Sequence, residues 1–321
     1  MIDGREDLNE ELPEAIIERL RQELEVRCNG IEEKLDCKLL VLMMAEQWAS
    51  IERRTVDDMM RFLLEHESEY RGFERLCAML HSPGGDADAA YQIARLLNRL
   101  AEKNNAELYF LIPRMAKSAA TLLACSGDEI LMTRIAELGP IDPQIMTPTG
   151  RWVSARTVRD SINELLEIVE QRRRLSSDRL SALFRELPLM EIGQFNRLIR
   201  YARNLLAELL KVRMLRGANQ SVVRDVCKKL TECYEYHGRP IMADEARNLG
   251  LKVRLLTDDQ ERAVLDAYWL FSSSIDQLES YAAALLQALP SPIYMPTRVW
   301  ISHGILYLPL TAEVLLGREG R

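Results

Sequence analysis

Two short segments of this chain combine residue types that can hold a nucleophile and stabilise a negatively charged oxygen. The segment HSPGGD at 81–86 places Gly84 and Gly85 after an apolar run and directly before an expected helix. The segment AKSAATLLA at 116–124 places Ser118 at the start of a second helix, built from small residues. Glycines let backbone N–H groups approach a ligand closely, and a helix N-terminus favours negative charge. Together the two segments predict a serine nucleophile beside an oxyanion-binding turn, as in a serine hydrolase.

Each segment also has a simpler structural interpretation when it is considered alone. A diglycine suits a tight turn between a strand and a helix, and serine is a common N-cap. The spacing around Gly84 and Gly85 fits neither the dinucleotide pattern GxGxxG nor the phosphate-loop pattern GxxxxGK[ST]. The combination of the two segments, rather than either one, therefore favours chemistry at Ser118.

A nucleophilic serine needs a base, and the chain offers several candidates. His237, just before the sequence GRPI, is the best imidazole, and Asp142 in ELGPIDPQ lies at a proline-bounded turn where it could orient an imidazole. Lys117 adjoins the serine, but neighbouring residues of a helix do not share a face. For the other histidines we expect surface roles at His66 and His303 and a strand-end role at His81.

The apolar pattern places these segments in a series of alternating strands and helices. Buried strands are expected at 37–45, 76–81, 107–113 and 129–132, separated by helices at 55–67, at 86–103 and from Ser118 onward. Alternation at these lengths implies a parallel sheet with right-handed crossovers. The alternation stops near residue 150, and from 155 to 235 the pattern is almost wholly helical.

Composition and charge narrow the classes of partner. The 321 residues carry a net charge of −7, which argues against a nucleic-acid partner because phosphate binding needs concentrated Lys and Arg. The six cysteines form no CxxC pair and have no histidine-rich neighbours, so we expect neither a metal nor a cofactor. The first residues lack the pattern of a signal peptide and no apolar run is long enough to span a bilayer. We therefore expect a cytoplasmic protein without a membrane partner.

Four motifs together resemble the serine dehydrogenase proteinase family, part of the Clp-protease and crotonase superfamily. They are HSPGGDADAAYQIARLL, PRMAKSAATLLACSGDEILM, AELGPIDPQ and HGRPIMADEARNLGLKV. The resemblance implies Ser118 as nucleophile and oxyanion donors from the Gly84–Gly85 turn and the Ala119 N–H. The position of the Clp subunit's histidine falls here at Asp142, and the position of its acid falls near His237.

Imidazole and carboxylate are therefore both available but exchanged between two loops, which leads to the hypothesis of a Ser118–His237–Asp142 triad. Triads occur in several chain orders on unrelated folds, so the exchange does not forbid this one. The rival is a serine–lysine dyad, as in the signal peptide peptidases of the superfamily, and it would need Lys117 or Lys211.

The resemblance implies an α/β fold, the Clp/crotonase spiral of ββα units, with a helical insertion and a helical C-terminal extension. We expect an N-terminal helical arm at 1–35, a catalytic core at 36–150 and 232–256, the insertion at 151–231, and a C-terminal helix with an extended tail at 257–321. The implied protein is a homo-oligomeric serine peptidase, a trimer or stacked ring. It would cleave peptides or proteins through an acyl-enzyme, with a possible regulatory protein partner. The alternatives are a crotonase-type acyl-CoA thioester enzyme and a non-catalytic ring-forming adaptor on the same fold.

Overall fold

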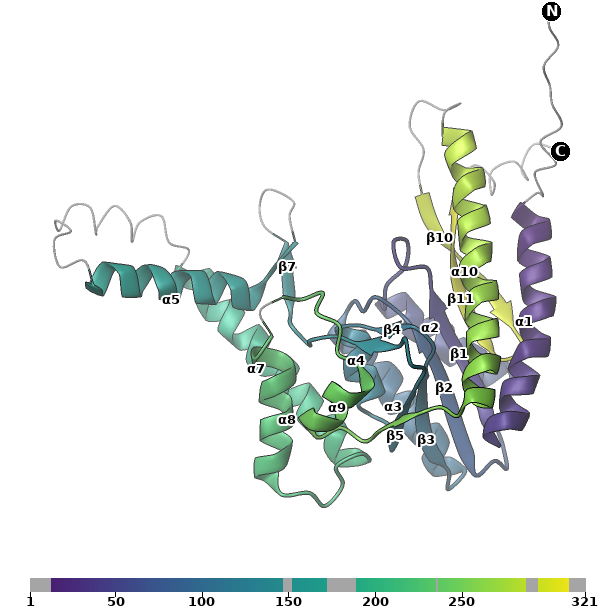
Figure 1. Ribbon diagram of the computed structural model, residues 1–321, viewed down its shortest axis with the longest axis horizontal. Helices are drawn as coiled ribbons and strands as arrows, with labels where there is room; N and C mark the ends of the chain where they lie inside the picture. The colour runs from purple at the N-terminus through teal and green to yellow at the C-terminus, as the bar shows by residue number, and fades with distance from the viewer. Residues whose placement is uncertain (1–12, 147–151, 172–188, 235, 287–293, 312–321) are drawn as a thin grey trace, which may run out of the picture.

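The central sheet forms where strands carry apolar side chains on both faces. The computed structural model of this chain describes residues 13–146, 152–171, 189–234, 236–286 and 294–311 (Figure 1). In β1 (Lys38–Met44) successive residues belong to two separate hydrophobic cores, with Val41 in one and Leu42 in the other. Strands buried on both faces are typical of a parallel sheet that helices cover on each side.

Seven strands form this sheet in the order β10–β11–β1–β2–β3–β5–β9. The other strands are β2 (Arg75–His81), β3 (Glu107–Ile112), β5 (Glu129–Met132), β9 (Val253–Leu255), β10 (Tyr294–Ile301) and β11 (Gly304–Thr311). All neighbours pair in parallel except β10 and β11, which form an antiparallel hairpin. The tail that the sequence indicated as extended is therefore part of the sheet, because β11 pairs with β1.

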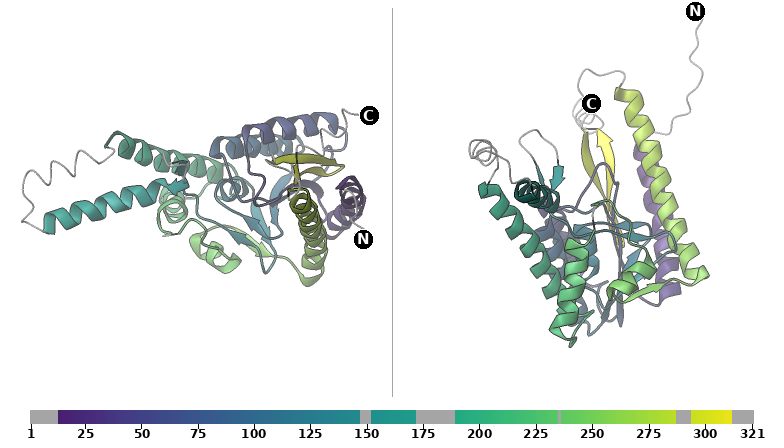
Figure 2. Two further views of the ribbon diagram at one scale, coloured as in Figure 1. Left: turned by 90° about the horizontal axis from the view of Figure 1, so that it is seen from above. Right: turned by 60° about the vertical axis from the view of Figure 1, so that its left-hand side comes forward.

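Helices cover both faces of the sheet and make three layers (Figures 1 and 2). The helices α1 (Pro13–Leu35) and α10 (Asp258–Leu286) pack side by side on one face. On the opposite face lie α2 (Arg53–Glu65), α3 (Ala87–Lys103) and α4 (Ala119–Ala124). The carboxyl end of β2 and the start of α4 both belong to this second side, where the glycine turn meets Ser118.

Short secondary strands repeat the unit expected from the resemblance. β3 is followed by β4 (Met115–Ala116) and then α4, and β5 is followed by β6 (Glu137–Leu138), which pairs in parallel with β4. An isolated bridge from Ser82 to Ala116 continues this second layer beyond β2. The mixed α/β architecture built from such units confirms the expected fold class.

A helical part projects from the core after the hairpin of β7 (Gln144–Met146) and β8 (Trp152–Ser154). It contains α5 (Ala155–Gln171), α7 (Leu189–Val212) and α8 (Gln220–Glu232). Leu206 and Leu209 of α7 are fully buried in the core that also holds α3 and α4. The chain then returns through α9 (Ala243–Leu249) to β9. Residues 172–188 of the expected helical stretch lie outside the described residues, and the expected domain boundaries stay a prediction.

Candidate active site

The glycine turn after β2 is shaped by contacts that exclude side chains. Gly84 and Gly85 have φ of 110° and 136°, which L-residues rarely adopt. A Cβ on Gly84 would lie 2.7 Å from the Lys117 carbonyl oxygen, and one on Gly85 would lie 2.2 Å from the Ile51 carbonyl oxygen. Gly84 is thus pressed against the segment that carries Ser118, as the sequence predicted, and Gly85 against the segment before α2.

The two glycines differ in how their N–H groups are used. The Gly84 N–H donates to the Ser82 hydroxyl at 3.1 Å, so it holds the turn itself. The Gly85 N–H donates to no acceptor in the described part of the chain, and Gly85 lines the cavity beside Ser118. Of the two glycines, only Gly85 therefore offers an N–H to an oxyanion.

Ser118 occupies a strained position between β4 and α4. Its φ of 49° and ψ of −115° lie outside the regions that non-glycine residues normally adopt. Its side chain does not cap the helix and makes no hydrogen bond to any described residue, so the simple N-cap interpretation does not apply. The N–H of Ala119 is one of the first donors of α4 and has no acceptor within the helix. A strained serine at a turn into a helix is typical of a nucleophile held exposed to substrate.

A buried threonine helps to fix the start of α4. The Thr121 hydroxyl donates to the Ala116 carbonyl oxygen at 2.6 Å and accepts from the Gly139 N–H at 3.0 Å. These bonds join the segment before Ser118 to the loop that follows β6. That loop carries Asp142, so the hydrogen bonds of Thr121 link the segment of Ser118 to the segment of Asp142.

Asp142 and His237 approach each other across two adjoining loops. The Oδ2 of Asp142 lies 3.9 Å from the Nδ1 of His237, and Asp142 is 8% exposed. The Asp142 Oδ1 and the His237 Nδ1 are buried and make no hydrogen bond to any described residue. Leu138 and Ile241 exchange two backbone hydrogen bonds of 2.9 and 3.0 Å, which tie the two loops together. The structure thus brings the predicted acid and imidazole together, slightly beyond hydrogen-bond distance.

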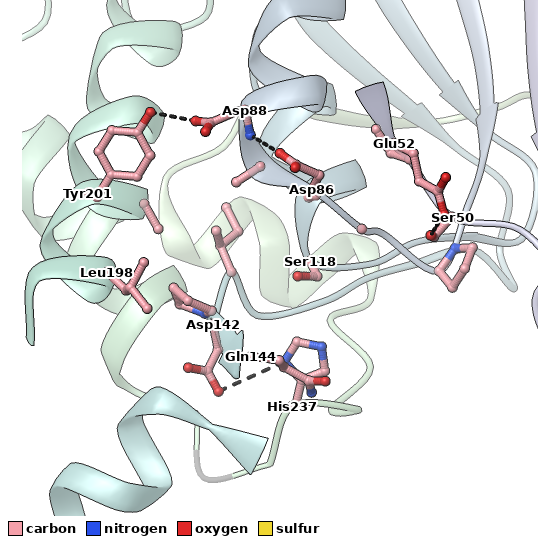
Figure 3. A pocket seen from close by; sticks show the side chains of 18 residues that line it. Ser50, Glu52, Asp86, Asp88, Ser118, Asp142, Gln144, Leu198, Tyr201 and His237 are labelled. Carbon is pink, nitrogen blue, oxygen red and sulfur yellow. Dashed lines mark hydrogen bonds and ion pairs between the residues drawn. The ribbon is translucent and has the colours of Figure 1, made fainter. Parts of the chain in front are cut away.

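Ser118, Asp142 and His237 face one cavity of about 650 Å³ (Figure 3). Gly85 and Ala119 also line it, so the predicted nucleophile, base, acid and N–H donors meet in one place. No hydrogen bond joins Ser118 to His237 among the described residues. Catalytic hydrogen bonds are often long before substrate binds, so this separation does not exclude a triad.

The lysines proposed as rival bases do not line this cavity. Lys117 forms an ion pair with Glu137 at 3.1 Å and donates to the Gly238 carbonyl oxygen at 3.4 Å, with its side chain packed against Gly139. Lys211 lies along a separate groove between α7 and α8. Both positions favour the imidazole over a lysine as the base.

The other histidines depart in part from the sequence expectation. His81 lies at the end of β2 as expected, and burial lowers its pKa to about 3. His303 is 4% exposed rather than on the surface, because the β10–β11 hairpin carries it into the molecule. Its ring lies 2.9 Å from the Ser302 hydroxyl and 3.8 Å from Glu32. The surface role expected for His303 was wrong.

Several residues that line the cavity could not be found from the sequence: Ser50, Glu52, Asp88, Gln144, Leu198 and Tyr201. Leu198 and Tyr201 come from α7, which packs beside α3, and the Tyr201 hydroxyl donates to Asp88. Asp88 alone among them lies close to the diglycine in the sequence, but its type and spacing gave it no role. The helical part therefore forms one wall of the cavity, which helical periodicity alone did not reveal.

Two other types of site are absent from the described residues. No cluster of three or more His, Cys, Asp or Glu residues could hold a metal ion. In the same part of the chain, no helix has the length and apolar character needed to cross a bilayer.

Several known proteins are similar to this chain in sequence or in structure. Two uncharacterized proteins of Methanocaldococcus jannaschii, MJ0137 and MJ1495, are each 28% identical over 190 residues, or 59% of this chain. The match spans only 57% and 56% of their lengths. Two solved structures of the 1510-N membrane-bound stomatin-specific protease share 14% and 16% identity and cover 69% and 70% of this chain, with TM-scores of 0.42. The matches cover 81% and 78% of the two solved chains. The first of these structures is a serine-to-alanine mutant, and the second is a lysine-to-alanine mutant in complex with a substrate peptide.

A match to a family profile over most of the chain identifies the family of this protein. The profile of the ClpP-like SDH-type serine proteinases matches residues 75–278, from the start of β2 into α10. This range includes the glycine turn, Ser118, Asp142 and His237. The chain belongs to the family of ClpP-like SDH-type serine proteinases.

Proposed function

We propose that this protein is a serine peptidase that cleaves peptide bonds through an acyl-enzyme on Ser118. The observation that carries the proposal is the strained Ser118, whose hydroxyl has no partner among the described residues and faces a cavity shared with His237 and Asp142. Family membership supports the same reaction class.

The arrangement assigns a role to each group. The Ser118 oxygen attacks the carbonyl carbon of the scissile bond and its proton passes to the Nε2 of His237. Asp142 faces the Nδ1 side of the ring and stabilises the imidazolium that forms. The N–H groups of Gly85 and Ala119 receive the oxyanion. The imidazolium then protonates the leaving amine, and water hydrolyses the acyl-enzyme by the same steps in reverse.

The cavity argues against an acyl-CoA substrate. Coenzyme A carries several phosphate charges, which need Lys or Arg nearby. No Lys or Arg is among the described residues that line the cavity, whereas four carboxylates are. A thioester enzyme of the crotonase type would also stay active without the Ser118 hydroxyl, so the same variant separates the two functions.

We propose peptides or proteins as substrates and a homo-oligomer as the working form. A regulatory partner that binds α7 would act directly on the cavity wall formed by Leu198 and Tyr201. The mass of the native assembly, measured with and without cell extract, tests both expectations. The cytoplasmic location stays a prediction.

The deciding experiment is labelling with a fluorophosphonate probe, followed by mapping of the modified peptide. We expect labelling at Ser118 in the wild type, none in Ser118→Ala, and unchanged labelling in Ser50→Ala, a control serine on the same cavity wall. We expect His237→Gln to slow labelling by about 10²- to 10⁴-fold, the usual contribution of a general base.

Each contrary result has a distinct meaning. If His237→Gln were labelled as fast as the wild type, a group other than the His237 imidazole would have to be the base. No modification of Ser118 in the native assembly, with extract present, would reject the serine peptidase and leave the ring-forming adaptor.

A further inference from the structure

Among the described residues, the cavity around Ser118 is lined by carboxylates and by no Lys or Arg. Its described lining includes four acidic side chains and neither Lys nor Arg: Glu52, Asp86, Asp88 and Asp142. In the described part of the chain, the first three form no ion pair with a basic side chain. His237 is the only residue with a basic side chain among the described residues that line the cavity, and its ring faces Asp142.

The acidic side chains flank the nucleophile on more than one side. Figure 3 shows Asp88 beside Tyr201 on one side of Ser118 and Glu52 on the other, with Asp86 between them. Asp88 lies on α3, whereas Glu52 is the N-cap of α2, so two separate elements contribute charge. A peptide lying across Ser118 would therefore pass carboxylates on both sides of the scissile bond.

Hydrogen bonds hold these carboxylates in place without neutralising them. The Oδ1 of Asp86 accepts from the N–H groups of Asp88 and Ala89 at 2.7 and 3.0 Å. Asp88 accepts from the Tyr201 hydroxyl, and this bond raises the pKa of Tyr201 to about 12. All of these donors are neutral, so the negative charge stays on the wall of the cavity.

Asp142 provides an independent sign that a donor is missing. It is 8% exposed, and its Oδ1 is buried with no hydrogen-bond partner among the described residues. Its other oxygen faces His237, so Oδ1 is the one without a donor. Buried carboxylate oxygens are normally paired, which indicates that a ligand supplies the donor.

We infer that this cleft selects peptides with a Lys or Arg side chain next to the bond presented to Ser118. The inference rests on the proposed peptidase function and names its substrate class. A cationic side chain would be attracted by carboxylates on either side of the serine, whereas an acidic side chain would be repelled. Because the carboxylates are partly exposed, the preference should weaken as salt increases.

Binding and turnover together test the inference. Three fluorescent peptides of one sequence carry Lys, norleucine or Glu beside the central bond. Their binding to Ser118→Ala is measured by anisotropy and their cleavage by the wild-type protein. We expect the Lys peptide to bind about tenfold more tightly than the norleucine peptide, the effect of one charge-assisted hydrogen bond, and the Glu peptide to bind most weakly.

Conservative variants locate the preference. Asp88→Asn and Glu52→Gln keep the size of each side chain and remove its charge, so each should lower the Lys-to-norleucine ratio about threefold or more. Asp57→Asn on the exposed face of α2 is the matched control and should leave the ratio unchanged.

The outcomes separate this inference from the proposed function. Cleavage of all three peptides at equal rates would overturn the charge preference and leave the peptidase standing. Selective binding of the Lys peptide without cleavage by the wild type would support the preference and reject the peptidase. Equal or absent binding of all three peptides, or a preference that Asp57→Asn lowers as much as Asp88→Asn, would overturn the inference.

Discussion

At the scale of single residues, Ser118 shows how surroundings enforce an unfavourable backbone conformation. A non-glycine residue at φ 49° costs on the order of 1–3 kcal/mol, and the conformation persists only because its neighbours hold it there. Gly84 leaves room for its Cβ, and the bonds of Thr121 fix the segment on either side. The strain is therefore part of how the hydroxyl is directed into the cavity.

His81 leads to a prediction about stability in acid. Burial lowers the pKa of His81 to about 3 from an ordinary 6.5, with a smaller effect from the charge of Arg114. As pH falls below 6.5, the unfolded chain binds this proton and the folded chain does not, so the free energy of unfolding falls. His81 alone should lower it by about 2 kcal/mol between pH 7 and pH 5.

Urea unfolding at the two pH values measures this effect. His81→Leu should lose about 2 kcal/mol less than the wild type over the same interval, because it binds no proton. If the free energy of unfolding of His81→Leu fell as much between pH 7 and pH 5 as that of the wild type, the buried neutral state of the His81 ring would be contradicted.

At the scale of elements, the turn between β2 and α3 sets the distance between the N–H donors and Ser118. Gly84→Ala would place a methyl group 2.7 Å from the Lys117 carbonyl oxygen at a φ of 110°. We expect a loss of about 2 kcal/mol in the free energy of unfolding. Fluorophosphonate labelling should slow by about 100-fold, since the Gly85 N–H would be displaced.

Gly30→Ala is the matched control for this substitution. Gly30 lies within α1, and a Cβ there would meet nothing within 4 Å. Alanine should raise the free energy of unfolding by about 0.5–1 kcal/mol and leave labelling unchanged. Wild-type labelling in Gly84→Ala would show that this turn does not position the oxyanion donors.

At the scale of the whole molecule, Arg213 anchors the helical part to the core. Its side chain is 6% exposed, and its guanidinium contacts Asp128 at 2.7 Å, Asn98 at 2.6 Å and the Ala106 carbonyl oxygen at 3.2 Å. Removal of one partner from a buried ion pair leaves the other charge uncompensated. Arg213→Met should therefore cost about 3 kcal/mol and loosen α7.

Denaturant unfolding and hydrogen exchange across residues 189–212 check this expectation. Arg203→Met is the control, because the ion pair of Arg203 with Glu232 on α8 is partly exposed and contributes less than about 1 kcal/mol. Faster exchange in α7 should appear only in Arg213→Met. Equal effects of the two variants would contradict the anchoring role.

The sequence by itself determined the local parts of this protein. Apolar runs of strand length predicted β1, β2, β3 and β5, because a strand buried on both faces needs an apolar residue at every position. The diglycine and Ser118 could be recognised because backbone freedom and helix starts are properties of neighbouring residues. The family resemblance built on these motifs is confirmed by the profile match over 75–278.

Only the tertiary structure decided which distant residues share the site. His237 and Asp142 meet because Leu138 and Ile241 pair across more than a hundred residues, and Tyr201 reaches Asp88 because α7 docks beside α3. The burial of His303 likewise depends on the pairing of β11 with β1. Periodicity records which face of an element is buried but carries no information about its partner. The walls of the cavity and its acidic charge were therefore settled by long-range packing.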